Sequence, residues 1–331
     1  MYNVYLRALM KKICITGGSG FISSHFIAAL PDCEIHILDL VAPKFPSHAT
    51  FFQGDIRNLD EVLHAFEGCD TIIHLAAMHH DFGIPDSAYF DTNVNGAKVI
   101  LEAAQQLNIN SILNFSSVAV YGNKGNPGPT DESTVPAPTN PYGFSKLEAE
   151  QLFTQWQEAS IERKLIVVRS TVVFGANNLA NVLNLIKAID SGIYIQVGKG
   201  ENIKSLAYVE NIVAASLFAY QLKTSGKLMF NYVDGPQLNS KTIASMQAKM
   251  LGKKVPITLP MWFVLLLAKP FDALIWLTNK NLPISSKRVI KLSTQTYHSA
   301  EFIKKLGFKA SFSIEYGMQE MINWYRAKHK K

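Results

Sequence analysis

Short apolar segments alternate with helical patterns through the first half of the chain, and this alternation restricts the possible folds severely. Six segments have the length and composition of strands: Lys12–Thr16, Glu34–Asp39, Thr50–Gln53, Thr71–Leu75, Ser111–Ser116 and Leu165–Ser170. Helical patterns lie between them: Phe21–Leu30, Asn58–Phe66, Tyr89–Leu107 and Pro141–Ala159. Successive strand–helix–strand units with right-handed crossovers predict an α/β fold with a Rossmann-like, doubly wound parallel sheet.

The pattern becomes less regular after Gly175. Helices are predicted at 179–191, 209–221, 241–251 and 314–326, with an extended piece at 194–197 and a strand at 228–233. We therefore expect a Rossmann domain at 10–174 plus about 205–235. Residues 175–204 and 236–331 should form a smaller substrate-binding lobe, and residues 1–9 an N-terminal extension.

Composition excludes several classes of protein. The chain has 331 residues, of which 48% are hydrophobic, and a net charge of +6. Its basic residues are scattered and form no stripe with interleaved aromatics, so nucleic acid is not expected as a partner. Cys14, Cys33 and Cys69 are an odd number without a C-x-x-C pair, which argues against a disulfide framework or a zinc site. No signal peptide is apparent, and a cytoplasmic location is expected.

One strongly apolar stretch, Met261–Leu277, raises the question of a membrane. Lys269, Pro270 and Asp272 interrupt it, and it falls short of the roughly 20 clean apolar residues that a span requires. We interpret it as a buried helix pair or the wall of a substrate pocket. The alternative is peripheral association, with the stretch lying on a membrane surface.

The first predicted strand runs into a glycine-rich turn and a helix, Thr16-Gly17-Gly18-Ser19-Gly20-Phe21-Ile22-Ser23. Such a turn brings the backbone close to a pyrophosphate at the helix N-terminus. Asp39 ends the second strand, 22 residues after Gly17. A carboxylate there would bind the ribose hydroxyls and repel a 2′-phosphate, which favours NAD over NADP. The alternative is that Asp39 merely ends a strand.

Tyr142 and Lys146 lie four residues apart in a predicted helix, so they share one face. Asn140 is a candidate N-cap, and Pro141 suits the first turn. An ammonium beside a phenol favours the phenolate, lowers its pKa from about 10 and makes it a proton shuttle. A solvated pair without catalytic use is the alternative.

Six motifs in order resemble the extended short-chain dehydrogenase/reductase family, which contains NAD-dependent epimerases and dehydratases of sugar nucleotides. The resemblance covers nearly the whole chain. The chain departs from the family pattern at Ser23, where many members have a third glycine. The matching motifs are Thr16–Ile22, Gly54-Asp55, His74–Ala77, Thr92–Gly96, Phe115–Gly122 and Tyr142 with Lys146.

The resemblance implies a role for each matching residue. Tyr142 would be the acid/base, Ser117 (rather than Ser116) would bond the reacting oxygen, and Lys146 would hold the nicotinamide ribose. Asp55 would contact the adenine. The implied NAD-binding residues are Gly17, Gly20, Phe21, Ile22, Asp39, Asp55, Ile56, Leu75, Ala76, Ala77, Asn93, Tyr142 and Lys146.

The substrate side is less determined. Lys204 occupies a segment in which family members place an arginine on the substrate diphosphate, and Arg288 is a second diphosphate candidate. Asn178 precedes a helix and is a candidate for phosphate or sugar. Val172 stands where many sugar-nucleotide epimerases have asparagine, which weakens the 4-epimerase interpretation.

The resemblance leads to one principal hypothesis and two alternatives. The principal one is an NAD-dependent oxidoreductase or epimerase that acts on a nucleoside-diphosphate sugar by 4-epimerase or 4-keto-reductase chemistry. The apolar stretch motivates the first alternative, a 3β-hydroxysteroid-dehydrogenase-like enzyme for an apolar alcohol; the second is a non-catalytic NAD-sensing regulator. No metal is expected, although His79 and His80 are adjacent. The family implies a homodimer through 89–107 and 141–159.

Overall fold

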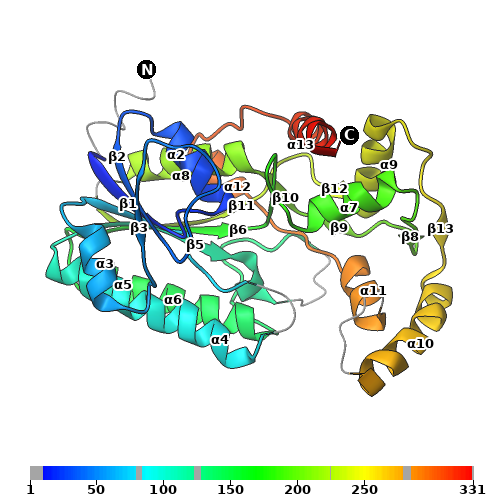
Figure 1. The fold of residues 1–331 in the computed structure, drawn as a ribbon, viewed down its shortest axis with the longest axis horizontal. Coiled ribbons are helices and arrows are strands. Elements are labelled where there is room, and N and C mark those ends of the chain that lie inside the picture. Colours follow the sequence, from blue (N-terminus) through cyan, green and yellow to red (C-terminus); the bar gives the residue numbers. More distant parts are fainter. Residues whose placement is uncertain (1–9, 80–83, 123–127, 224, 279–284, 330–331) are drawn as a thin grey trace.

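A central sheet of seven strands, all paired in parallel, organises the protein (Figure 1). The computed structural model describes residues 10–79, 84–122, 128–223, 225–278 and 285–329. The strand order is β11-β6-β5-β4-β1-β2-β3, which confirms the predicted doubly wound sheet. The strands are β1 (Lys12–Thr16), β2 (Glu34–Asp39), β3 (Thr50–Gln53), β4 (Thr71–His74), β5 (Ser111–Ser117), β6 (Lys164–Ser170) and β11 (Gly226–Tyr232).

Helices cover both faces of this sheet, as parallel sheets require. On one face lie α2 (Phe21–Ala29) and α8 (Val209–Leu222), which pack against each other. On the other lie α3 (Leu59–Phe66), α5 (Gly96–Gln106) and α6 (Pro141–Glu158). Each layer has its own buried core, with Phe26 and Ile212 in the first and Ile100 and Phe153 in the second.

The predicted helix 89–107 is more complex in the structure. It begins earlier, as α4 (Asp86–Phe90), passes through a π-helical stretch (Asp91–Asn95) and continues as α5. Such π-helical turns are rare and occur frequently at functional sites. Asn93, one of the predicted cofactor residues, lies in this stretch.

The smaller lobe lies beyond one end of the sheet (Figure 1). It contains α7 (Asn181–Asp190), α9 (Ser240–Leu251), α10 (Met261–Thr278) and α11 (Ser286–Ser293). Short strand pairs connect its segments: β7 (Val172–Phe174) with β10 (Leu206–Tyr208), β8 (Gln196–Val197) with β13 (Thr258–Leu259), and β9 (Ile203–Lys204) with β12 (Leu238–Asn239). After α12 (Glu301–Lys305), α13 (Ile314–His329) packs against α7, α9 and β10. The domain boundaries proposed from the sequence stay a prediction.

The apolar stretch forms one helix, α10, which continues through Pro270. The prediction of a buried helix pair is therefore wrong. The interior of the lobe is filled by α7, α9 and α13, so α10 contacts α11 at the edge and leaves much of its surface open, with Trp262 68% and Leu277 75% exposed. Within the described ranges, no helix combines the length and the apolarity needed to cross a membrane.

Candidate active site and cofactor site

The first turn of α6 carries Tyr142 and is fixed by the predicted cap. The Asn140 side chain accepts a hydrogen bond from the backbone N–H of Gly143 at 2.8 Å, and Pro141 occupies the start of the helix. Gly143 then approaches the chain after β5 so closely that a Cβ would lie 2.6 Å from the carbonyl oxygen of Ala119. Because Ala119 follows Ser117 by two residues, this glycine brings the start of α6 and the end of β5 together.

Lys146 lies one turn further along α6 and is buried against β5. Its Nζ donates to the carbonyl oxygen of Phe115 at 2.7 Å. Burial lowers the pKa of Lys146 to about 8, although the carboxylate of Glu150 opposes the shift. At neutral pH most molecules therefore keep a positive charge at this position, one helical turn after Tyr142.

The two serines at the end of β5 have different surroundings. Ser116 is buried, and its hydroxyl donates to Oε2 of Glu150 at 2.8 Å. The Ser117 hydroxyl oxygen accepts from the N–H of Ala119 at 3.2 Å, so its own proton can be donated elsewhere. The choice of Ser117 as the residue that would bond a reacting oxygen stays a prediction.

A buried ion pair beneath these residues was not foreseen from the sequence. Arg169 of β6 binds Glu150 of α6 through two nitrogens, Nε at 3.1 Å and Nη2. Its Nη1 also donates to the hydroxyl of Tyr121 at 2.7 Å, and that hydroxyl donates to Asn231 of β11. The network therefore joins α6 to three neighbouring segments. Glu150 follows Lys146 by four residues, and this helical spacing was the one available signal.

The glycine turn has the backbone geometry that close approach demands. Gly17 has φ +69°, and a Cβ there would lie 2.7 Å from the backbone nitrogen of Ala76. At the start of α2, Gly20 provides no side-chain cap, so the first N–H groups of the helix can bind an anion. Ser23, at the position of the family's third glycine, is fully buried and donates to the carbonyl oxygen of Gly18 at 2.7 Å. Tight packing of helix on strand is thus retained.

The carboxylates predicted to contact the adenosine lie at the ends of neighbouring strands. Asp39 accepts from the N–H groups of Ser19, at 3.1 Å, and Val41, at 3.3 Å, which holds it beside the glycine turn. Asp55 binds the guanidinium of Arg57, whose charge lowers the pKa of the Asp55 carboxyl. Phe21 and Ile22 are half-buried at the start of α2.

Other predicted cofactor residues have mainly structural contacts. The Ile56 side chain is buried and packs under α5, where a Cβ on Gly96 would meet it at 2.5 Å. Asn93 is buried, and its amide donates to the carbonyl oxygen of Met78 and to the hydroxyl of Ser145. Its oxygen accepts from the N–H of Met78 at 2.7 Å. Asn93 thus fixes the loop after β4, in which the partly buried Leu75, Ala76 and Ala77 lie.

The predicted substrate residues are divided between two segments of the lobe. Lys204 of β9 donates from Nζ to the carbonyl oxygen of Thr294 at 2.6 Å, immediately after α11, the helix that contains Arg288. Asn178 belongs to a different loop. Its amide donates to the carbonyl oxygen of Val173 at 2.7 Å and its oxygen accepts from the N–H of Ala180. Lys204 therefore contacts the end of the helix that carries Arg288, whereas Asn178 shapes its own turn.

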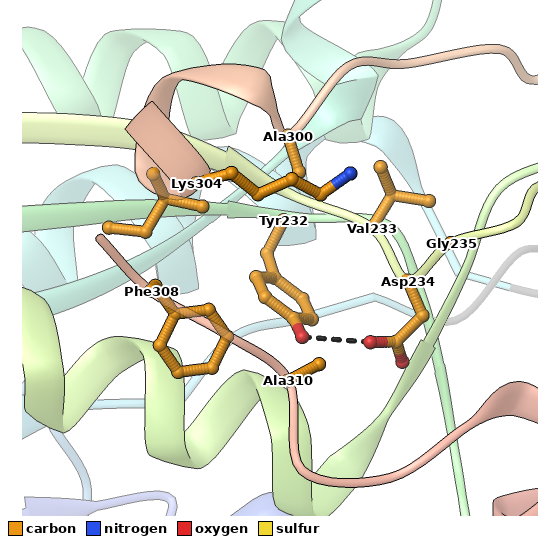
Figure 2. Close-up of a pocket in the computed structure, with 9 residues that line it drawn as sticks. Tyr232, Val233, Asp234, Gly235, Ala300, Lys304, Phe308 and Ala310 are labelled. Carbon is orange, nitrogen blue, oxygen red and sulfur yellow. Dashed lines mark hydrogen bonds between the residues drawn. The ribbon is translucent and has the colours of Figure 1, made fainter. Parts of the chain in front are cut away.

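A small pocket behind β11 is a separate feature (Figure 2). Its lining includes none of the predicted site residues. Asp234, at its edge, accepts hydrogen bonds from the Tyr232 hydroxyl at 2.8 Å and from the Tyr208 N–H at 2.6 Å, so it serves the fold. His80 lies outside the described residues, and the ring of His79 is 3.1 Å from the carbonyl oxygen of Ala77. In the described part of the chain, no three His, Cys, Asp or Glu side chains group around a metal position.

Comparison with known proteins gives consistent results. Residues 13–232 match the NAD dependent epimerase/dehydratase family. N-acetyl-alpha-D-glucosaminyl-diphospho-ditrans,octacis-undecaprenol 4-epimerase from Escherichia coli O157:H7 is 37% identical over 97% of both chains. UDP-glucose 4-epimerase from Neisseria meningitidis serogroup B is 29% identical over 72% of this chain and 74% of its own. The structure of Thermus thermophilus UDP-glucose 4-epimerase with NAD superposes with a TM-score of 0.75 at 20% identity, covering 95% of this chain and 99% of that one.

Proposed function

The chain belongs to the NAD-dependent epimerase/dehydratase family, and on this basis we propose that it is a 4-epimerase for an N-acetylhexosaminyl diphosphate carried on a polyprenol. The observation that carries this proposal is the 37% identity to the polyprenol-linked 4-epimerase, which extends over 97% of both chains. The UDP-glucose 4-epimerase matches only 72% of this chain. Likeness over the full length includes the lobe that would receive the substrate.

NAD is the proposed cofactor, and the glycine turn supports it. The N–H groups at the uncapped start of α2 suit a pyrophosphate, and Gly17 lets the turn pack directly against the backbone of Ala76 after β4. Asp39 would bind the ribose hydroxyls, and Lys146 the nicotinamide ribose. When bound, NAD supplies a hydride acceptor that can return the hydride to the same carbon.

Tyr142 would carry the proton in this reaction. Its phenolate takes the proton from the C4 hydroxyl while the hydride leaves C4, which gives a 4-keto sugar. Ser117 donates a hydrogen bond to the same oxygen, and the Lys146 ammonium stabilises the phenolate. In the second half Tyr142 returns the proton to that oxygen as hydride re-enters on the opposite face of C4. The net change is inversion at one carbon, without net oxidation.

Lys204 and Arg288 are proposed to bind the diphosphate. Lys204 contacts Thr294, the residue after α11, and Arg288 lies in the first turn of that helix. Together their charges would offset two negative charges. A nucleoside-diphosphate sugar has the same diphosphate and remains the second candidate, supported by the likeness to UDP-glucose 4-epimerase. A homodimer through residues 89–107 and 141–159 and a cytoplasmic location stay predictions.

Turnover assays separate the two candidates. The purified protein would be incubated with NAD and either polyprenyl-diphospho-N-acetylglucosamine or UDP-N-acetylglucosamine, and the released sugars would be analysed for the C4 epimer. We expect turnover of the polyprenyl substrate, and Tyr142→Phe should reduce it about 1000-fold or more while NAD binding is retained. Turnover of the UDP-sugar alone would replace the proposal by the second candidate.

A further inference from the structure

The outer face of α10 is apolar and open to solvent. Helical geometry places residues at spacings of three and four on one side, and the exposed residues of α10 follow that spacing. On the opposite side Ala268 is fully buried and Asp272 accepts from the N–H of Ser286, at the start of α11. The exposed apolar side chains are Trp262, Leu266, Leu267, Phe271, Leu274 and Leu277, between 37% and 75% exposed. We call this set the α10 apolar face.

This arrangement is the reverse of the usual one, in which a surface helix turns its apolar side inward. Eight of the large hydrophobic side chains exposed in the described structure lie between residues 255 and 277. Figure 1 shows α10 at the outer edge of the lobe, away from the central sheet. A contiguous apolar patch of this kind indicates a partner.

The charge of the surrounding sequence indicates which partner. Residues 249–291 contain eight lysines and arginines and one acidic residue, Asp272. Of these, Lys249, Lys254 and Lys269 are exposed. A helix with an apolar face and flanking basic residues fits the interface of a bilayer that contains anionic lipids. The 18 residues of α10 would lie along the surface over about 27 Å.

The lobe edge is also connected to the catalytic region. α11 packs against α10 and leads to Thr294, whose carbonyl oxygen accepts from Lys204. Four residues later, the ring of His298 stacks on Tyr121 at 6.0 Å, and Tyr121 lies between Ser117 and Tyr142 in sequence and binds Arg169. These contacts, from α10 to α11, from Thr294 to Lys204 and from His298 to Tyr121, connect the α10 apolar face to the catalytic region.

The proposed substrate gives a physical reason for docking. Removing a lipid chain from a bilayer costs about 0.8 kcal/mol per CH₂, so a polyprenol of tens of carbons would cost on the order of tens of kcal/mol to extract. An enzyme for such a substrate must approach the bilayer and take only the sugar diphosphate.

We propose that α10 lies in the interface of an anionic phospholipid bilayer, with its apolar face among the acyl chains, and so brings the active site to a lipid-linked sugar. The inference rests on the proposed function for the identity of the substrate. Docking itself rests on the exposed apolar face, on Lys269 of the same helix and on the basic character of the sequence from 249 to 291.

Vesicle binding tests the docking surface directly. The holoenzyme would be mixed with vesicles of phosphatidylcholine, with or without phosphatidylglycerol, and the bound fraction measured by flotation. Trp262→Glu/Leu266→Glu should lower the partition coefficient about 100-fold, because two apolar side chains no longer enter the bilayer. A matched control, Ile161→Glu/Leu222→Glu, alters side chains that are 87% and 46% exposed elsewhere on the molecule and should bind as the wild type does. Trp262→Ser/Leu277→Ser repeats the test without added charge.

The outcomes distinguish docking from the proposed function. Support requires that the α10 variants lose vesicle binding and turnover of full-length substrate in vesicles, yet keep turnover of a short-chain soluble analogue. Variant-sensitive vesicle binding without turnover of any lipid-linked sugar would refute the proposed function and leave the docking surface standing. Equal vesicle binding by wild type and α10 variants would overturn the inference. Failure of the wild-type protein to bind vesicles would also overturn it. If the only effect of an α10 variant is to convert a dimer into a monomer, the inference is overturned as well, because the α10 apolar face would then join two copies of the chain.

Discussion

Replacing Lys146 by methionine tests whether burial of the ammonium group lowers its pKa and so destabilises the folded protein. Lys146 follows Tyr142 by one helical turn. Methionine has a similar length and no charge, so it can fill the same space. In the structure the Lys146 side chain is 3% exposed and its Nζ donates to the carbonyl oxygen of Phe115. The change should abolish turnover, because the phenolate loses its stabilising charge, and at the same time it should stabilise the protein at neutral pH.

The magnitude follows from the pKa. The drop from 10.5 in water to about 8 in the folded protein corresponds to about 3 kcal/mol at 1.36 kcal/mol per pKa unit. Since the folded pKa is the lower one, folding disfavours the protonated form, and the penalty is complete below about pH 8 and vanishes above about pH 10.5. Methionine removes the penalty but loses a hydrogen bond worth about 1 kcal/mol. The Lys146→Met variant should therefore be more stable by about 2 kcal/mol at pH 7.

Urea denaturation of nucleotide-free protein measures this difference. Between pH 7 and about pH 9.5 the advantage of the variant should fall by about 2 kcal/mol, because the wild-type lysine loses its proton on folding. Lys249→Met, at an exposed lysine in α9, is the control and should show no such dependence on pH. A variant less stable than the wild type at pH 7, or an advantage that does not change with pH, would refute the argument.

Two further changes test the cofactor site and the buried ion pair. Asp39→Ser removes the carboxylate beside the glycine turn, and we expect the preference for NAD over NADP to fall about tenfold in a binding titration; an unchanged preference would show that another residue excludes the 2′-phosphate. Glu150→Gln leaves the buried Arg169 without its carboxylate and should cost about 3 kcal/mol in urea denaturation. In contrast, Glu158→Gln on the same helix alters an exposed carboxylate 4.0 Å from Lys227 and should cost less than about 1 kcal/mol, and equal costs would argue against the role of the buried pair.

The sheet and its helices could be predicted because their signals are local. Strands β1, β2 and β3 have the predicted limits, since each is a short apolar segment between turn residues. The N-cap at Asn140 was also predictable, because a cap depends on the residues of one helical turn. The π-helical stretch around Asn93 was not, since it depends on contacts with the loop after β4 and with Ser145.

At the site, the sequence alone could not predict contacts between segments that are far apart along the chain. Arg169 and Glu150 meet because β6 pairs with β5 and α6 covers both strands, and no local pattern states which charges face each other. The same limit explains the wrong expectation for α10. An apolar helix that faces a protein core and one that faces a bilayer have the same composition, so their sequences alone did not distinguish burial from exposure.

Inversion at C4 requires the sugar to rotate while its diphosphate stays bound. The type of cation that binds the diphosphate affects this rotation. In the proposed reaction bound NAD would return the hydride from the side on which it accepted it, so the keto sugar would have to turn over between the two steps while its diphosphate stays bound. A bidentate arginine fixes the direction of its hydrogen bonds, whereas a lysine ammonium acts as a point charge on a flexible stem. Lys204 at the position where family members use arginine would hold the diphosphate and still tolerate rotation about the sugar–phosphate bond. Lys204→Arg should then lower kcat more than it raises KM, and a pure effect on KM would argue against this role.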